Sequence, residues 1–326
     1  MDSHHMQCME VWGGNQLADS GVVMAGLDAW VYSKPFGGAD GGGDVYYVSS
    51  CATGRITRLL VADVSGHGQA VGGIAAQLRS LMRRHINQID QSRFVQSMNK
   101  QFGALAREGC FATALVTTFF APTNQLSLCN AGHPPPLLYR AATKRWSFLE
   151  NKRSAEHGDA IGNVPLGVMD ETAYDLFDVR LKVGDLVLCY TDSLIEARDC
   201  DGQLLGQAGL LRIVQSIDST DPTQLTLKLL AAIEDCCDAD KLCGDDVTVL
   251  LFRPNGMAPS TPLRERLLAP VRIMKSFFAS LKPGGEATAW PEFSIANIGG
   301  AVLSPLGRFR GRKRPRGVKL IEQIKP

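Results

Sequence analysis

The order of strand-like and helix-like segments restricts the fold of this chain more than any other feature. The expected elements are strands at 27–31, 44–50 and 58–64, helices at 69–89 and 92–107, strands at 112–120, 125–130, 136–140, 145–150, 174–181 and 185–190, helices at 210–217 and 225–233, and a strand at 246–253. Ser92 is expected to cap the second helix. Strands and helices grouped in this way predict an α+β fold, in which sheets pack against each other with helices outside.

Charge divides the chain into an acidic body and a basic tail. Residues 1–253 hold 21 Lys and Arg against 29 Asp and Glu, whereas residues 254–326 hold 13 against 4. The predicted domains are a loosely ordered lead-in at 1–24, a folded domain at 25–253, and a tail at 254–326. The tail combines an amphipathic candidate helix at 263–281 with a cationic run at 308–316.

The cysteines and the hydropathy indicate the cellular compartment. The chain has nine Cys and no Cys-x-x-Cys pair, which is typical of reduced thiols in a cytoplasmic protein and not of a zinc knuckle. No run of 18 or more apolar residues is present, so an ordinary membrane span is not expected. We therefore expect a cytoplasmic protein, with membrane association through the basic tail as the alternative.

Four aspartates stand at the ends of predicted strands and are the candidates for chemistry. They are Asp44, Asp63, Asp192 and Asp245. Any one of them alone is most simply a turn residue or a helix cap. Together they predict carboxylates that converge at one edge of the sheets, where their charges would repel unless cations lay between them. The sequence therefore predicts a metal-dependent hydrolase.

Six short motifs in register give a family resemblance over residues 25–253. They are Gly42-Gly43-Asp44, Asp63-Val64-Ser65-Gly66-His67-Gly68, Asn130-Ala131-Gly132-His133, Pro165-Leu166-Gly167, Gly184-Asp185 with Thr191-Asp192, and Asp245-Asp246-Val247-Thr248. With these motifs the chain resembles the SpoIIE/RsbU-type bacterial branch of the PPM (type 2C) metal-dependent serine/threonine protein phosphatases. The resemblance implies an αββα four-layer sandwich, in which two packed antiparallel sheets are flanked by helix pairs.

The resemblance also implies a centre with two Mn²⁺ or Mg²⁺ ions. Asp63 would bridge both ions, the main-chain carbonyl of Val64 would bind one, Asp192 and Asp245 would bind the other, and Asp44 would bind directly or through water. Asp246 is the rival of Asp245, because the doubled acid leaves the register open by one residue. A water bridging two such ions becomes a nucleophile near neutral pH and would attack the phosphoester directly.

Three residues near these ligands are candidates for supporting roles. His133 is predicted either to donate to the leaving oxygen or to brace its turn. His67 is read as a structural residue behind the ligands, and Gly66 as a position of tight chain approach. The family usually continues Thr191-Asp192 with Gly, and Ser193 would cost about 1 kcal/mol if that position required a positive φ.

The implied function is dephosphorylation of phosphoserine or phosphothreonine in a bacterial signalling protein. Family analogy suggests a STAS-type anti-sigma-factor antagonist as the substrate, and a regulator or dimer contact through residues 69–107. The alternative is a catalytically weak phosphatase-fold binding module that acts as a regulatory scaffold through its basic tail. That tail could also dock on nucleic acid or on an anionic membrane, or pack on the acidic body.

Overall fold

The computed structural model describes residues 3–6, 10–51, 54–66, 69–85, 88, 90–105, 109–151, 163–170, 172–199, 201–217, 221–236 and 244–257. The chain divides into two compact units, Met1–Pro291 and Glu292–Pro326, and only the first contains described residues. The predicted tail beyond residue 257, with its candidate helix and cationic run, therefore lies outside the described residues, as does His67.

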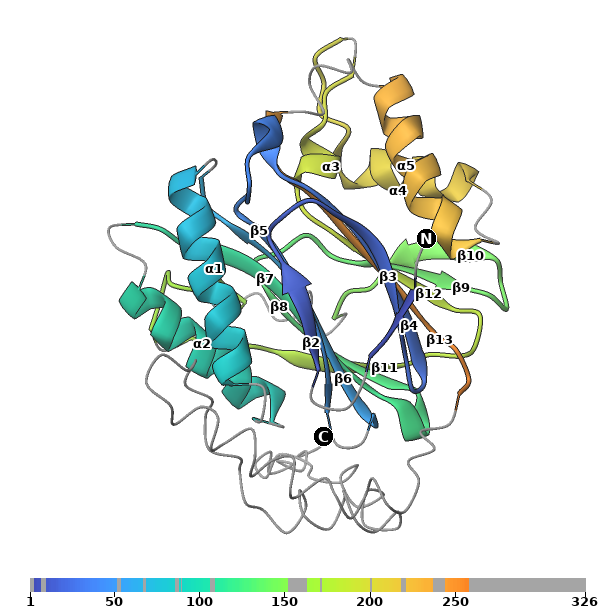
Figure 1. Ribbon diagram of the computed structural model, residues 1–326. Helices are drawn as coiled ribbons and strands as arrows, with labels where there is room; N and C mark the ends of the chain where they lie inside the picture. The colour runs from blue at the N-terminus through green and yellow to red at the C-terminus, as the bar shows by residue number, and fades with distance from the viewer. Residues whose placement is uncertain are drawn as a thin grey trace, which may run out of the picture. The chain divides into compact units, whose positions relative to one another are not determined.

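Two sheets form the centre of the first unit (Figure 1). The seven-stranded sheet has the order β1 (Ser3–His5), β3 (Ala18–Met24), β4 (Leu27–Lys34), β13 (Val247–Pro254), β12 (Leu186–Tyr190), β9 (Leu137–Arg140) and β10 (Arg145–Phe148). The six-stranded sheet has the order β11 (Leu176–Arg180), β8 (Gln125–Ala131), β7 (Ala112–Phe120), β6 (Ile56–Val64), β5 (Asp44–Cys51) and β2 (Val11–Gly14). The strand pairs are antiparallel except β1 with β3, which are parallel.

Helices cover the outer face of each sheet (Figure 1). The six-stranded sheet carries α1 (Gln69–Arg84) and α2 (Gln91–Leu105), and the seven-stranded sheet carries α3 (Ser193–Glu196), α4 (Gly206–Ser216) and α5 (Pro222–Cys236). Short 3₁₀ turns, η1 (Phe36–Gly38) and η2 (Ala121–Thr123), lie in the connections. The predicted four-layer sandwich is confirmed. Within the described ranges, no helix has both the length and the apolar character needed to cross a membrane.

Apolar side chains fill all three spaces between the four layers. On β6, Leu59 and Val61 point into the space between the sheets, whereas Leu60 and Ala62 point toward α1 and α2. Side chains alternate between the two faces of a strand. A strand that is buried on both faces is therefore apolar in its centre, which explains the run Leu59-Leu60-Val61-Ala62 that predicted this strand.

Two details of the expected secondary structure are wrong. The segment predicted to be a loosely ordered lead-in contains β1, β2 and β3, and β3 pairs with β4 along its whole length. Its first residues, Ala18-Asp19-Ser20-Gly21, have low β propensity, so the strand depends on its neighbours. At the second helix, the side chain of Asp90 accepts the backbone N–H of Arg93 at 3.2 Å, so Asp90 is the cap and not Ser92.

Candidate metal centre

The six-stranded sheet places two of the predicted aspartates side by side. Asp44 begins β5 and Asp63 lies near the end of β6, and the antiparallel register pairs these two residues directly. Opposite residues in an antiparallel pair have Cβ atoms about 4.5–5.5 Å apart. On its other side, Asp63 pairs with Thr113 of β7. Two carboxylates from consecutive strands thus meet at one end of this sheet.

The seven-stranded sheet brings the other two aspartates to its own strand ends. Asp192 stands two residues after β12, and Asp245 stands two residues before β13, which pairs antiparallel with β12. Backbone pairing continues past the named strands, because Thr191 N–H donates to the Thr248 carbonyl at 3.0 Å. The end of β12 and the start of β13 therefore lie together.

A hydrogen bond joins the two sheets at this point. The hydroxyl of Thr191, next to Asp192, donates to Oδ2 of Asp44 at 2.8 Å. The same hydroxyl accepts the backbone N–H of Thr248 at 3.0 Å, which orients it. Thr191 thus fixes the position of Asp44 relative to the strands that carry Asp192 and Asp245.

The electrostatics show that these carboxylates share one region. The pKa of Asp63 is raised from its ordinary value of 3.8 to about 7. Burial is the main cause, followed by the neighbouring carboxylates, which are those of Asp192, Asp245, Asp246 and Glu196. Burial and Asp63 also raise the pKa of Asp44 well above its usual range, although hydrogen bonds from Thr191 and Thr248 oppose the shift. The pKa of Asp192 is raised by burial, Glu196 and Asp245.

Asp246 has a different setting from Asp245. Its carboxylate is buried and accepts the backbone N–H groups of Phe36 at 2.6 Å and Gly43 at 2.5 Å. Both carboxylates raise the pKa of Asp63, but Asp245 is exposed and also raises that of Asp192, whereas Asp246 is engaged by the loop. Of the two registers that the sequence leaves open, this geometry favours Asp245 as the ligand and Asp246 as the brace of the β4–β5 loop.

Two glycines allow that loop to approach the centre closely. A Cβ atom added at Gly42 would lie 2.4 Å from the carboxylate of Asp246. One added at Gly43 would lie 2.9 Å from the carbonyl oxygen of Val64, the predicted main-chain ligand. Any larger residue would push the loop away from both groups. Gly66, predicted behind the ligands, adopts a φ of 103°.

His133 is a buried residue of the turn that follows β8. Its backbone N–H donates to Oδ1 of Asn130 and its carbonyl accepts Nδ2 of Asn130, each at 2.7 Å. Its Nδ1 lies 2.8 Å from the hydroxyl of Thr113, which is paired with Asp63. Burial lowers the pKa of the imidazole to about 3, so the ring is neutral near pH 7. This setting favours the bracing role over donation of a proton to a leaving group.

The backbone strain considered for Ser193 is not observed. Ser193 is the first residue of α3, and Asp192 before it has α-helical angles of φ −63° and ψ −23°. Ser193 is absent from the described non-glycine residues with positive φ. The Thr-Asp-Ser sequence therefore carries no backbone strain of the expected kind.

Two residues of this region were not predicted to be site residues. Glu196 contributes to the raised pKa of both Asp63 and Asp192. It stands four residues after Asp192, the spacing of one helical turn, and the short helix α3 was not predicted. Thr191 was part of a motif, but nothing in its local sequence indicated a bond to Asp44.

The donor set fits hard divalent cations. As the side chains stand, no three His, Cys, Asp or Glu residues in the described part of the chain form a group that could hold a metal ion. The donors themselves are all oxygens, and burial together with the neighbouring carboxylates raises the pKa values of Asp44, Asp63 and Asp192. Mg²⁺ and Mn²⁺ prefer such oxygen ligands and keep several waters. The residues thus suit Mg²⁺ or Mn²⁺ in chemistry and charge.

Comparison with known proteins identifies the family of the chain and a curated relative. Residues 53–255 match the family described as Stage II sporulation protein E (SpoIIE). A curated relative is the phosphoserine phosphatase RsbU of Bacillus subtilis (strain 168), which is 24% identical over 151 residues. That alignment covers 45% of this chain and 41% of RsbU, so the chain spans less than half of this relative's length.

Solved structures share the fold at low sequence identity. The RsbU and RsbW domains of Rv1364c from Mycobacterium tuberculosis match with a TM-score of 0.60 at 24% identity, over 80% of this chain and 70% of that one. The PP2C phosphatase domain of SpoIIE from Bacillus subtilis, with a fragment of its regulatory domain, matches with a TM-score of 0.56 at 16% identity, over 76% and 64%. RsbX, solved in complex with magnesium, matches at 0.50 and 14% identity, over 77% and 100%.

Proposed function

The chain belongs to the SpoIIE family, and on this premise we propose that it is a metal-dependent phosphoserine/phosphothreonine protein phosphatase of bacterial signalling. The observation that carries the proposal is the convergence of carboxylates from both sheets, which raises the pKa of Asp63 to about 7. Such a cluster costs folding free energy and is expected where cations bind.

Each residue of the cluster has a proposed part in holding two Mg²⁺ or Mn²⁺ ions. Asp63 pairs with Asp44 and is influenced by the charges of Asp192 and Asp245, and it is the proposed bridging ligand, with the carbonyl of Val64 as a further ligand. Asp192 and Asp245 are the ligands from the other sheet, and Asp44 completes the set. When bound, the ions lower the pKa of water and offset the charge of the phosphoryl group.

The chain's own residues orient this ligand set. Thr191 holds Oδ2 of Asp44, and Asp246 holds the loop that leads into Asp44. Thr113 pairs with Asp63 in the sheet, and its hydroxyl contacts Nδ1 of His133. Through this contact the neutral imidazole helps to fix the turn after β8. Positions held in advance reduce the entropy that substrate and ion binding would otherwise cost.

The proposed substrate is a phosphorylated regulatory protein, with a STAS-type anti-sigma-factor antagonist as the specific candidate. The named relatives support this class, because RsbU is a phosphoserine phosphatase and the Mycobacterium tuberculosis structure pairs RsbU with RsbW domains. The fold itself does not select a substrate.

Release of phosphate from p-nitrophenyl phosphate in Mn²⁺ tests the proposal. We expect turnover by the wild type, loss of at least about 100-fold in Asp63→Asn and Asp192→Asn, and loss on chelation with EDTA. Asp235→Asn is the matched control, because Asp235 is an exposed acid on α5 and does not contribute to the pKa shifts of the cluster. Equal, slow release by the wild type and the Asp63 and Asp192 variants would refute the enzyme assignment.

A further inference from the structure

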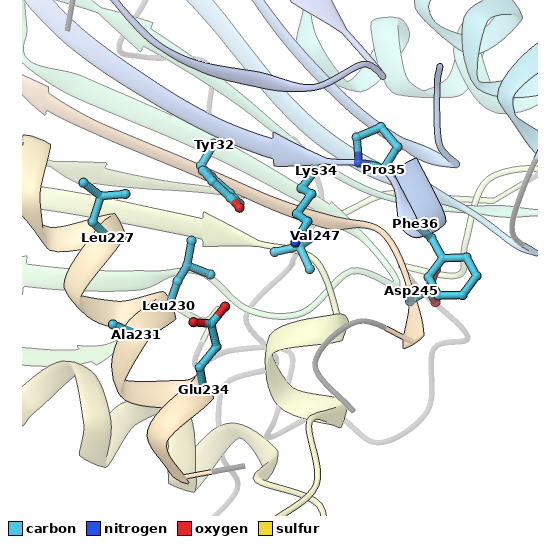
Figure 2. A pocket seen from close by; sticks show the side chains of 11 residues that line it. Tyr32, Lys34, Pro35, Phe36, Leu227, Leu230, Ala231, Glu234, Asp245 and Val247 are labelled. Carbon is cyan, nitrogen blue, oxygen red and sulfur yellow. The ribbon is translucent and has the colours of Figure 1, made fainter. Parts of the chain in front are cut away.

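A hollow of about 220 Å³ lies beside the acidic centre, between the helix α5 and the strands β4 and β13 (Figure 2). Its walls are mainly apolar and include Tyr32, Phe36, Leu227, Leu230, Ala231 and Val247. On α5, Leu227, Ala231 and Glu234 follow each other at spacings of four and three and so share one helix face. We call this hollow the α5 trough.

The α5 trough is continuous with the acidic centre. Asp245 lines it and also contributes to the raised pKa of Asp63 and Asp192. Figure 2 shows Asp245 and Phe36 together at one end of the trough, with Leu227 and Tyr32 toward the other. A chain that places a phosphorylated side chain at the acids can therefore extend along the trough.

The loop at this end of the trough is fastened to the centre. Phe36, in the turn η1, donates its backbone N–H to Asp246, which also holds Gly43 next to Asp44. The shape of the trough and the position of a proposed metal ligand thus depend on one carboxylate. A pocket built in this way is preformed, and it does not depend on ordering a loop when the ligand binds.

The size and lining of the trough indicate its occupant. Pockets for cofactors and drug-sized ligands usually measure about 300–1,000 Å³, so this trough suits a single side chain. Its two charges besides Asp245 are those of Lys34 and Glu234, which are of opposite sign. With Asp245 engaged by a cation, the remaining lining has no net charge and is mainly apolar, and this favours an apolar side chain over a charged one.

We propose that the α5 trough receives a large apolar side chain of the phosphoprotein substrate, a few residues from its phosphorylated Ser or Thr. This inference rests on the proposed phosphatase function and adds a determinant of substrate choice to it. Burial of such a side chain in an apolar pocket raises discrimination by about 10- to 200-fold. The contact would select among phosphoproteins that all present the same phosphoryl group.

The test uses short phosphoserine peptides in which one Phe is moved through the flanking positions of an otherwise Gly- and Ser-rich chain. We measure kcat/KM in Mn²⁺ and, separately, the Kd of fluorescent peptides by anisotropy. For the wild type we expect one flanking position at which Phe improves both quantities by about tenfold or more over Gly. In Ala231→Trp, which fills the trough, we expect the ratio of Phe to Gly to fall toward one.

Two further variants keep the test decisive. Leu227→Ser removes an apolar wall at a residue that is 42% exposed, so it should fold even if the Trp variant does not. It should also reduce the ratio of Phe to Gly. Lys228→Trp is the matched control, because Lys228 is an exposed residue of the same helix that does not line the trough, and it should keep the wild-type ratio.

The outcomes separate this inference from the proposed function. Equal binding and turnover of the Phe and Gly peptides at every position, or a stronger preference for Arg or Asp than for Phe, would overturn the trough assignment. Failure of the wild type to hydrolyse p-nitrophenyl phosphate would overturn the phosphatase assignment instead, and the anisotropy measurements would still decide whether the trough binds an apolar side chain.

Discussion

Replacing Asp63 with Asn should stabilise the protein when divalent ions are absent. The folded state raises the pKa of this carboxyl from 3.8 to about 7, through burial and the neighbouring acids. Below the lower value the carboxyl is protonated in both the folded and unfolded states and has no effect. As the pH rises from 3.8 to about 7, the Asp63 carboxyl loses its proton first in the unfolded state. Stability therefore falls until the pH passes the folded pKa.

The size of the effect follows from the same shift. One pKa unit corresponds to about 1.36 kcal/mol, so the charged carboxylate of Asp63 costs the metal-free fold about 4 kcal/mol above pH 7. Partial contact with solvent reduces this figure, and we expect Asp63→Asn to gain about 2–4 kcal/mol near pH 8 and almost nothing near pH 4. At roughly 2–4 °C per kcal/mol, the melting temperature should rise by several degrees.

Urea unfolding in EDTA at both pH values measures this difference, and added Mn²⁺ should reduce it. The wild type would then gain about 2.7 kcal/mol at an ion concentration of 100 times Kd, and the variant should gain less. Asp185→Asn is the contrasting control, because Asp185 is buried against Arg140 at 2.7 Å and accepts two backbone N–H groups. That variant should lose stability. Equal stability of wild type and Asp63→Asn in EDTA near pH 8 would refute the reasoning.

Three further predictions concern the loop and the buried histidine. Gly42→Ala should lose about 1–3 kcal/mol in urea unfolding, because its Cβ would meet a carboxylate 2.4 Å away, whereas Gly73→Ala, with nothing within 4 Å, should be neutral or stabilising. Asp246→Ala should destabilise the fold by about 2 kcal/mol or more through its lost backbone partners, whereas Asp245→Ala should mainly weaken Mn²⁺ binding in calorimetry; the reverse pattern would exchange their roles. NMR titration of His133 should show a neutral ring from about pH 8 to pH 5, because burial lowers its pKa to about 3, and a midpoint near its ordinary value of 6.5 would contradict this.

The central strands and the long helices could be predicted from the sequence because their burial leaves a direct pattern. The strand expected at 112–120 matches β7 residue for residue, since its apolar run is bounded by turn residues. The strand β3 was not predicted, because Asp19, Ser20 and Gly21 interrupt its apolar pattern. Pairing with β4 along the whole strand compensates for this interruption. Helix α3 has only four residues and leaves no periodicity to detect.

The candidate site was predictable in its ligand types but not in its supporting contacts. The motifs around Asp44, Asp63 and Asp192 marked the acids, whose roles as ligands remain predictions. The division of work between Asp245 and Asp246 could not be read from two identical neighbouring residues. It depends on the N–H groups of Phe36 and Gly43, which come from a segment about 200 positions earlier.

The bond between Thr191 and Asp44 spans 147 positions of the chain and joins one sheet to the other. The acids on either side of it meet only after both halves of the sandwich have formed and packed. A partly folded chain in which the two sheets are separate would lack part of the proposed set of cation ligands. Ions should therefore act late in folding, slowing complete disassembly while leaving the early, local steps unchanged.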